Sequence, residues 1–285
     1  MAITTSTEST EPAEVEQPAV PTRPVDELRE PGDGSEKGRW ILRIFLFGLF
    51  FLAWQLIVET GVAREIILPK PTSVFANFFD TVTSTAILKH LSVTLQETLA
   101  GFFIGSTVGL TLAVIVALAP KATFVLRDYI TAFQSIPKVV FITILVTWFG
   151  FGMQSKIVLA AAISFFPVYI TAVVGMSGTP SPALRLMTLL KANRFERLYK
   201  LQFLHALPTI FAGLKNAFTS ALVGSIVGEF FGAKIGLGYL IVVNNHALRI
   251  PEVFSIVIIL SLIGVIGYTI IDWVGKRVCF WMPRG

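Results

Sequence analysis

Six long apolar stretches alternate with shorter polar stretches between residues 37 and 285. An α-helix rises about 1.5 Å per residue, so about 20 apolar residues cross a hydrocarbon layer of about 30 Å. The pattern therefore predicts six membrane-spanning helices and an all-α integral membrane protein. The predicted spans cover residues 40–58, 98–119, 129–152, 157–176, 208–231 and 253–271.

Two of these spans contain prolines that affect the prediction. Pro208 opens the fifth span, in the first-turn position that proline favours. Pro137 and Lys138 interrupt the third span.

Small residues and prolines predict further local structure. Gly101, Gly105 and Gly109 recur at every fourth position of the second span, a spacing that lets another membrane helix approach closely. Between the first two spans, the prolines of the sequence ILPKPTSVF predict an extended turn. Thr72 or Ser73 is then expected to cap a short amphipathic helix that lies along the outer interface.

The polar segment 181–208 separates the fourth and fifth spans and organises the rest of the chain. It is rich in basic residues and has Glu196 as its single acid. Apolar residues recur with helical spacing on both sides of residues 191–193, which predicts two short amphipathic helices with a break between them. Two interpretations remain open: a docking element for a cytoplasmic partner, or a helical loop lying on the bilayer surface. The basic residues are Arg185, Lys191, Arg194, Arg197 and Lys200, and the periodic leucines are Leu186, Leu189, Leu190, Leu198, Leu201 and Leu204.

Composition supports a membrane protein and assigns its orientation. The chain is 54% hydrophobic and 14% charged, which excludes an ordinary soluble domain. Residues 1–36 hold nine acids and two bases, a net charge of −7, and are expected to form a disordered acidic tail. The remaining 21 bases and nine acids give +12. The bases concentrate in 121–128, 177–207 and the C-terminus, so we expect these regions and the N-terminus to be cytoplasmic.

The sequence contains no pattern typical of catalysis. It lacks the GxxxxGK[ST] phosphate loop, and its three histidines are far apart. The glycines of residues 232–238 follow a membrane helix, so they predict a tight turn and not a dinucleotide site. We therefore expect no cofactor, no metal and no bound nucleic acid.

Charges inside the predicted spans are candidate functional residues, because each is costly in a bilayer. Glu229 lies within the fifth span and Lys138 within the third. Either residue lines a translocation path or holds helices together, and Lys138 also fits a lysine that reaches the interface. Asp272 and Lys276 have the spacing of an exposed ion pair.

Four motifs, in order, resemble the transmembrane permease subunits of bacterial ABC importers. LPKPTSVF, QSIPKVVFITILVTWFGFGMQSKI, ALPTIFAGLK and VGEFFGAKIGLGYLI are similar to segments of the branch that serves taurine, alkanesulfonates, nitrate and thiamine-pyrimidine precursors. The resemblance covers about residues 40–280. It implies a type I importer permease fold in the inner membrane, with cytoplasmic coupling helices and residues 37–285 as the permease domain.

The resemblance also implies partners and functional residues. ATPase subunits would bind the 181–208 segment, a second permease subunit would complete the path, and an external binding protein would deliver a small polar or anionic organic solute. ATP hydrolysis would occur in the separate ATPase, so this chain would not be an enzyme. The implied ATPase-docking residues are Arg185, Leu186, Met187, Leu190, Lys191, Ala192 and Arg194.

The docking segment departs from the family pattern of about EAAxxxGA. Arg185, Leu186 and Met187 replace Glu-Ala-Ala, and Lys191 replaces the glycine that permits a sharp break between the helices. Asn193 is a candidate for a left-handed turn in its place. The divergence leaves three hypotheses open: a heterodimer with a second permease, a co-varied ATPase, or a scaffold or sensor that no longer transports.

Overall fold

The computed structural model describes residues 36–119, 132 and 136–281, and these residues form helices joined by turns. The predicted acidic tail and the predicted 121–128 turn lie outside the described residues. The chain divides into two units, Met1–Phe50 and Phe51–Gly285, with the boundary inside the first helix. The helices are α1 (Glu36–Glu59), α2 (Pro71–Thr83), α3 (Thr85–Leu118), η2 (Lys138–Val140), α5 (Phe141–Phe149), α6 (Met153–Ser177), α7 (Ser181–Leu189), α8 (Arg194–Arg197), η3 (Leu198–Gln202), α9 (Phe203–Phe230), α10 (Leu237–His246) and α11 (Ile250–Val278).

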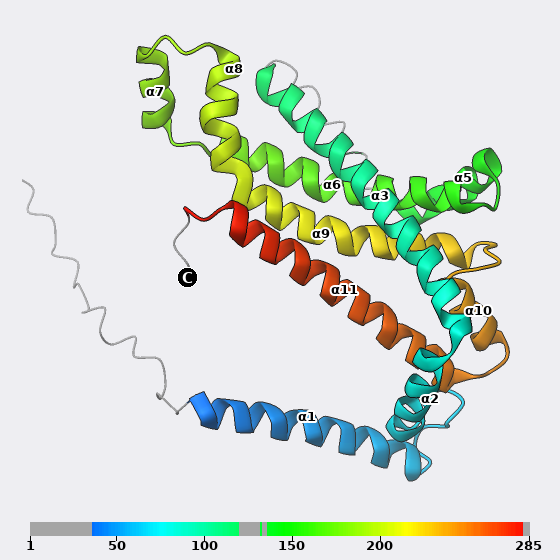
Figure 1. Cartoon of the computed structure of the whole chain (residues 1–285). Helices are drawn as coiled ribbons and strands as arrows, with labels where there is room; N and C mark the ends of the chain where they lie inside the picture. The colour runs from blue at the N-terminus through cyan, green and yellow to red at the C-terminus, as the bar shows by residue number, and fades with distance from the viewer. Residues whose placement is uncertain (1–35, 120–131, 133–135, 282–285) are drawn as a thin grey trace, which may run out of the picture. The chain divides into compact units, whose positions relative to one another are not determined.

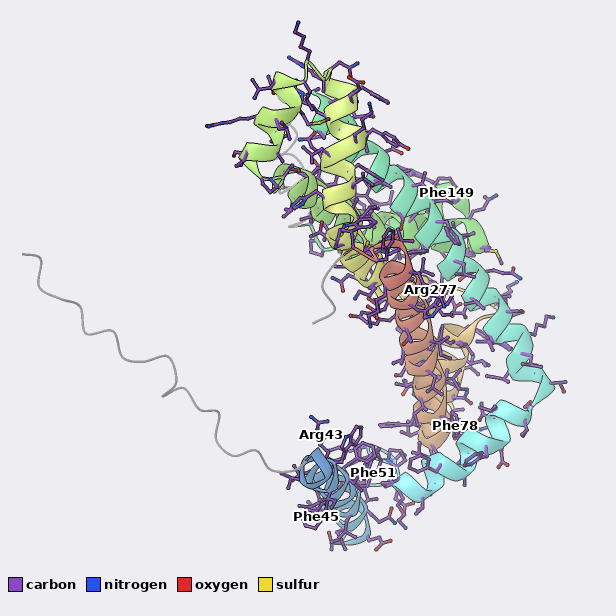
Figure 2. All side chains as sticks on the ribbon, turned by 60° about the vertical axis from the view of Figure 1, so that its left-hand side comes forward. Arg43, Phe45, Phe51, Phe78, Phe149 and Arg277 are labelled. Atoms are coloured by element: carbon purple, nitrogen blue, oxygen red, sulfur yellow. The ribbon has the colours of Figure 1, made fainter. Side chains whose placement is uncertain are left out.

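In the first unit, the described residues belong to the start of α1. The Arg43 guanidinium lies 5.5 Å from the centre of the Trp40 ring. Arg43 is labelled in Figure 2. Basic and tryptophan side chains at a helix end are typical of the membrane–water interface. This supports the predicted start of the first span.

Within the described residues, five helical segments are long and apolar enough to cross a membrane: Trp40–Glu59, Thr85–Leu118, Met153–Ser177, Arg194–Phe230 and Ile250–Val278. They correspond to the first, second, fourth, fifth and sixth predicted spans. The third predicted span is only partly described, as η2 and the nine-residue α5. A nine-residue helix is too short to cross by itself, so the count of six spans stays a prediction.

In the second unit, α3, α6 and α9 pack against one another and α11 packs on α9 (Figure 1). The predicted close approach at the α3 glycines is confirmed. A methyl group at Gly101 would overlap Ala160, and one at Gly105 would overlap the backbone of Ala161. Gly109 lies similarly close to α6. The absence of side chains at these positions therefore sets how near the two helices come.

Two sets of short elements lie at opposite ends of α6 and α9. The α5–α6 and α9–α10 turns share one end, which we call the α10 end, and α7 and α8 lie at the other (Figure 1). At the α10 end, α2 contacts α11. Figure 2 labels Phe78 of α2, which packs against a buried cluster that includes Ile256 and Ile259 of α11, and Arg277 at the far end of α11.

Two predicted helix starts are wrong. The second span begins at Thr85, 13 residues before the predicted start, so Glu97 lies inside the helix. Pro208 does not open the fifth span but lies inside α9. Helical structure is already continuous from Arg194 through η3, and a proline removes only one backbone hydrogen bond, which membrane helices tolerate.

Two predictions for the short elements are also wrong. The amphipathic helix α2 exists, but Pro71 occupies its first turn and Lys70 its N-cap position, without a side-chain cap from Thr72 or Ser73. The expected turn after Glu229 is interrupted by a ten-residue helix, α10. The residues of GLGYLIVVNNH are mostly helix-compatible once Gly236, with φ 127°, has turned the chain.

Candidate functional site

The segment between α6 and α9 projects from the bundle as two short helices, as predicted (Figure 1). None of the side chains of α7 is buried. Leu189 is 80% exposed and Leu190 69% exposed. The apolar face of α7 is therefore open, whereas Leu198, the first periodic leucine of the second predicted helix, is buried in the core with Ala206 and Ile210.

The break between α7 and α8 is made by Lys191. Its φ is 54°, in the left-handed region. The Lys191 N–H donates to the Thr188 carbonyl at 3.0 Å, and the Ala192 N–H donates to the Met187 carbonyl at 3.0 Å. This pair of bonds is a Schellman motif, in which the left-handed position is usually glycine. The predicted role of Asn193 in a left-handed turn is wrong, because its φ is −71°.

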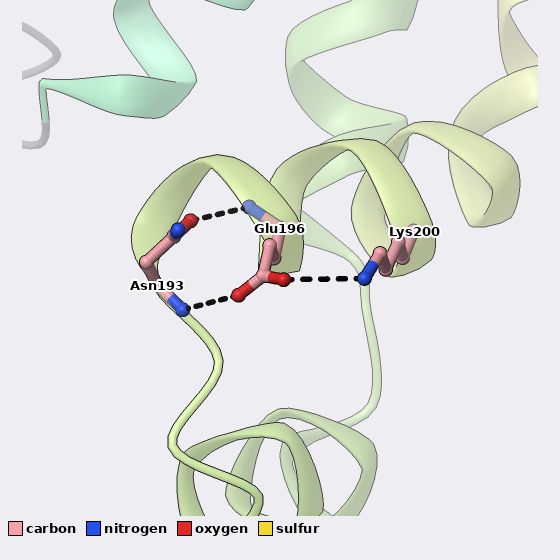
Figure 3. Close-up of polar contacts among 3 residues, drawn as sticks. All are labelled: Asn193, Glu196 and Lys200. Atoms are coloured by element: carbon pink, nitrogen blue, oxygen red, sulfur yellow. Dashed lines mark hydrogen bonds and ion pairs between the residues drawn. The ribbon is translucent and has the colours of Figure 1, made fainter.

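Asn193 instead starts α8 through a capping box (Figure 3). Its Oδ1 accepts from the Glu196 N–H at 2.8 Å, and its own N–H donates to Glu196 Oε2 at 3.0 Å. Lys200 Nζ lies 3.2 Å from Glu196 Oε1. Arg197 Nη1 donates to Thr188 Oγ1 at 3.4 Å, which joins the two helices. The capping box thus starts a helical run that continues through η3 into α9, and the Arg197–Thr188 bond connects α7 to this run.

Most of the predicted docking residues lie on this exposed projection. Met187 and Ala192 are half-buried, and the others are exposed: Arg185, Leu186, Leu190, Lys191 and Arg194. Leu189 and Phe195, which is 65% exposed, belong to the same surface although the family motif does not include them. The helical spacing of Leu189 with Leu186 is the sequence signal for it. We call these nine residues the α7–α8 surface.

A second candidate site lies at the α10 end, around Glu229. Glu229 is 1% exposed. Thr94 Oγ1 of α3 donates to Glu229 Oε1 at 2.6 Å, and the Gly238 N–H of α10 donates to Glu229 Oε2. Glu97, one turn after Thr94 on α3, is also 1% exposed. Glu229 thus joins three helices.

Lys156 of α6 completes this second site. It is 4% exposed, and its Nζ donates to the carbonyl oxygens of Phe151 at 2.9 Å and Gly152 at 3.0 Å. The stem of its side chain lies against Gly228, the residue before Glu229. We call Glu97, Lys156 and Glu229 the buried charge cluster.

Sequence reasoning missed two members of this cluster. Glu97 directly precedes the predicted second span, and Lys156 lies between the third and fourth predicted spans, 129–152 and 157–176. The signal for Glu97 was the absence of proline and glycine between Thr85 and Ala100, which favours helix. Lys138 begins η2, and its side chain lies outside the described part of the chain.

Comparisons with known proteins agree with the resemblance. The family model described as "Binding-protein-dependent transport system inner membrane component" matches residues 97–279. A probable ABC transporter permease protein of Haemophilus influenzae is 31% identical over 241 residues, covering 85% of this chain and 98% of that protein. The putative aliphatic sulfonates transport permease protein SsuC of Bacillus subtilis is 25% identical over 248 residues, covering 87% and 90%.

A solved structure has a similar fold. A chain of the MetNI methionine ABC transporter in inward-facing conformations aligns with a TM-score of 0.60 at 17% identity. The alignment covers 68% of this chain and 96% of that chain. The shared architecture is an importer permease fold.

Proposed function

The chain belongs to the family of binding-protein-dependent transport system inner membrane components, and we propose that it conducts a small polar or anionic organic solute. It is the transmembrane subunit of an ABC importer, which works with ATPase subunits and an external solute-binding protein. The solute class rests on the motifs shared with permeases for sulfonates and similar compounds, of which SsuC is one. ATP hydrolysis is assigned to the separate ATPase subunit.

The exposed α7–α8 surface is the observation that carries the mechanism. Leu189 and Leu190 are exposed, as are the basic residues Arg185, Lys191 and Arg194 of the same segment. Exposed leucines in a segment that also exposes basic residues are typical of a protein-binding surface, because the apolar side chains gain from burial and the charges select the partner. The ATPase is the partner proposed for this surface. The charge distribution supports a cytoplasmic location for it, with both chain termini on the same side.

The connection of α8 to α9 supports a mechanical role. Arg194–Phe230 is one helical run from the α7–α8 surface to the buried charge cluster. The capping box at Asn193 and the Arg197–Thr188 bond hold both short helices at its end. A displacement of the docked ATPases would therefore move α9, the basis of a rigid-body switch between inward- and outward-facing states.

The replacement of the family glycine by Lys191 does not remove the sharp break between α7 and α8 that docking requires. Lys191 takes the left-handed conformation that the family glycine would take, and both Schellman hydrogen bonds form. This favours a coupled transporter over a scaffold or sensor that has lost transport. Whether the second permease subunit is another copy of this chain or a different protein is a separate question, which purification answers.

The two candidate path residues have different support. The contacts of Glu229 with Thr94 and Gly238 favour a role in holding helices together. Lys138 remains a proposed path residue because it follows Pro137 within the third predicted span.

Reconstitution tests this function. The permease is co-expressed with its ATPase and purified, and the number of permease species in the complex is counted. Proteoliposomes that contain the complex are then supplied with the external binding protein and radiolabelled taurine, an alkanesulfonate, nitrate or a pyrimidine thiamine precursor. ATP-dependent accumulation of at least one solute is expected. A complex that binds the ATPase and the loaded binding protein but accumulates none of them would support the scaffold hypothesis.

A further inference from the structure

Two glycine turns meet at the α10 end of the bundle. The α5–α6 turn contains Gly150, with φ 75°, and the α9–α10 turn contains Gly232, with φ 90°. A methyl group at Gly232 would overlap the Phe151 ring, so the turns are in contact. The Lys156 ammonium donates to the Phe151 and Gly152 carbonyls. These hydrogen bonds attach the α5–α6 turn to α6.

The second turn is held by side chains from α3 and α9. The Gly236 N–H lies 3.1 Å from His90 Nδ1, and the Leu237 N–H donates to Thr94 Oγ1 at 2.8 Å. The Gly238 N–H donates to Glu229. Three successive N–H groups at the start of α10 are therefore satisfied by side chains of other helices, and a negative charge at this helix N-terminus is favourable.

The buried charge cluster lies between these turns. Among the residues that the structure describes, Glu97, Lys156 and Glu229 are the only buried side chains of the acidic and basic types. Lys156 lies in the first turn of α6 and Glu229 in the last turn of α9, so each opposes the dipole of its own helix. The unfavourable position of each residue is offset by the opposite charge of the other residue and by the turns that the two side chains bind.

The hydrogen bonds distinguish the two carboxyl groups. Both oxygens of Glu229 receive a donor, Thr94 on one and Gly238 on the other, as an ionised carboxylate requires. Glu97 Oε2 is buried and has no hydrogen-bond partner, which would be very costly for an ionised group. Glu97 follows Thr94, which bonds Glu229, by one turn of α3, so the two carboxyl groups are neighbours in the bundle, and a pair of neighbouring carboxyl groups is favoured when one of them holds a proton.

We propose that Glu97 is a neutral acid that donates its proton to the Glu229 carboxylate, and that this pair and the Lys156 ammonium form an electroneutral latch that holds both glycine turns on α3. With one proton in the pair, the cluster has one positive and one negative charge. The latch makes the α5–α6 turn, the α9–α10 turn and the start of α10 move as one body with α3. This goes beyond the proposed function, since it concerns the charge state and rigidity of the α10 end.

Infrared spectroscopy of the purified chain tests the proton directly. At neutral pH the wild type should show the carbonyl stretch of one protonated carboxylic acid, and D2O should shift it. Glu97→Gln should remove this band and retain the fold, because the amide donates to Glu229 as the acid did. The absence of a protonated-acid band in the folded wild type would overturn the proposal, whether or not the chain transports.

Charge-matched variants test the latch. Lys156→Met should lower the thermal unfolding midpoint of the ATPase complex by roughly 10 °C, because it leaves a buried carboxylate unpaired. Adding Glu229→Gln to Lys156→Met restores neutrality and should recover at least half of that loss. Equal midpoints for Lys156→Met with and without Glu229→Gln would contradict the proposal. Lys70→Met is the control, because it leaves Glu65, its partner at 2.6 Å, as a carboxylate that is 63% exposed, and its loss should move the midpoint far less.

Discussion

Lys215 of α9 and Asp272 of α11 face each other across the interface of these helices, with Nζ and Oδ1 2.7 Å apart. The second carboxylate oxygen of Asp272 lies 2.7 Å from Lys276 Nζ on the next turn of α11. Lys215 Nζ also lies 5.0 Å from the centre of the Tyr268 ring. The predicted Asp272–Lys276 pair is confirmed, but the contact that joins two helices is the one with Lys215.

The Asp272 contacts predict which of two substitutions lowers the thermal unfolding midpoint more. Asp272→Asn should lower the thermal unfolding midpoint of the purified chain, because it leaves Lys215, half-buried between the helices, without its counter-ion. Lys276→Met should lower it less, since the Lys276 side chain is 78% exposed. A larger loss for Lys276→Met than for Asp272→Asn would show that Asp272 does not bridge the helices.

The left-handed conformation of Lys191 predicts that substitutions can distinguish the effect of its backbone conformation on ATPase binding from the effect of its charge. Lys191→Gly should leave the unfolding midpoint nearly unchanged, because about 1 kcal/mol of relieved strain is offset by the greater freedom of glycine in the unfolded chain. It should weaken ATPase binding at most about fivefold, the effect of one exposed charge. Lys191→Val should weaken binding more, since a β-branched residue resists a positive φ. Binding is measured by titrating purified ATPase onto the chain in nanodiscs.

The helices and the structure of the 181–208 segment were predictable from sequence because they depend on local pattern. Apolar length located five spans, and the basic segment with its break at residues 191–193 was found by periodicity and charge. The buried charge cluster was not predictable in this way. Glu97, Lys156 and Glu229 are distant in sequence, and only the packing of α3, α6 and α9 brings them together. Leu198 likewise became a core residue because α8 continues into α9.

Reversal of charge on the α7–α8 surface predicts loss of coupling without loss of folding. Arg194→Glu should reduce ATPase co-purification and ATP-dependent uptake at least tenfold, because a like or unpaired charge meets the partner surface. The variant should still insert, since an acid in the first turn of α8 suits the helix dipole. Arg64→Glu, the same change on an exposed residue of the α1–α2 loop, is the control. Equal uptake in both variants would remove Arg194 from the docking surface.

The packing of α3 on α6 predicts opposite results for two glycine-to-alanine changes. Gly105→Ala should destabilise the chain by about 1–3 kcal/mol, because its methyl group would overlap Ser164 and the Ala161 carbonyl and push the helices apart. Gly264→Ala should be neutral or stabilising by up to about 1 kcal/mol, since the nearest atom to its methyl group is Leu222 Cδ2 at 3.6 Å and alanine is the better helix former. Unfolding midpoints in one detergent compare the pair directly. If Gly105→Ala is as stable as Gly264→Ala, the close contact of α3 and α6 does not depend on this glycine.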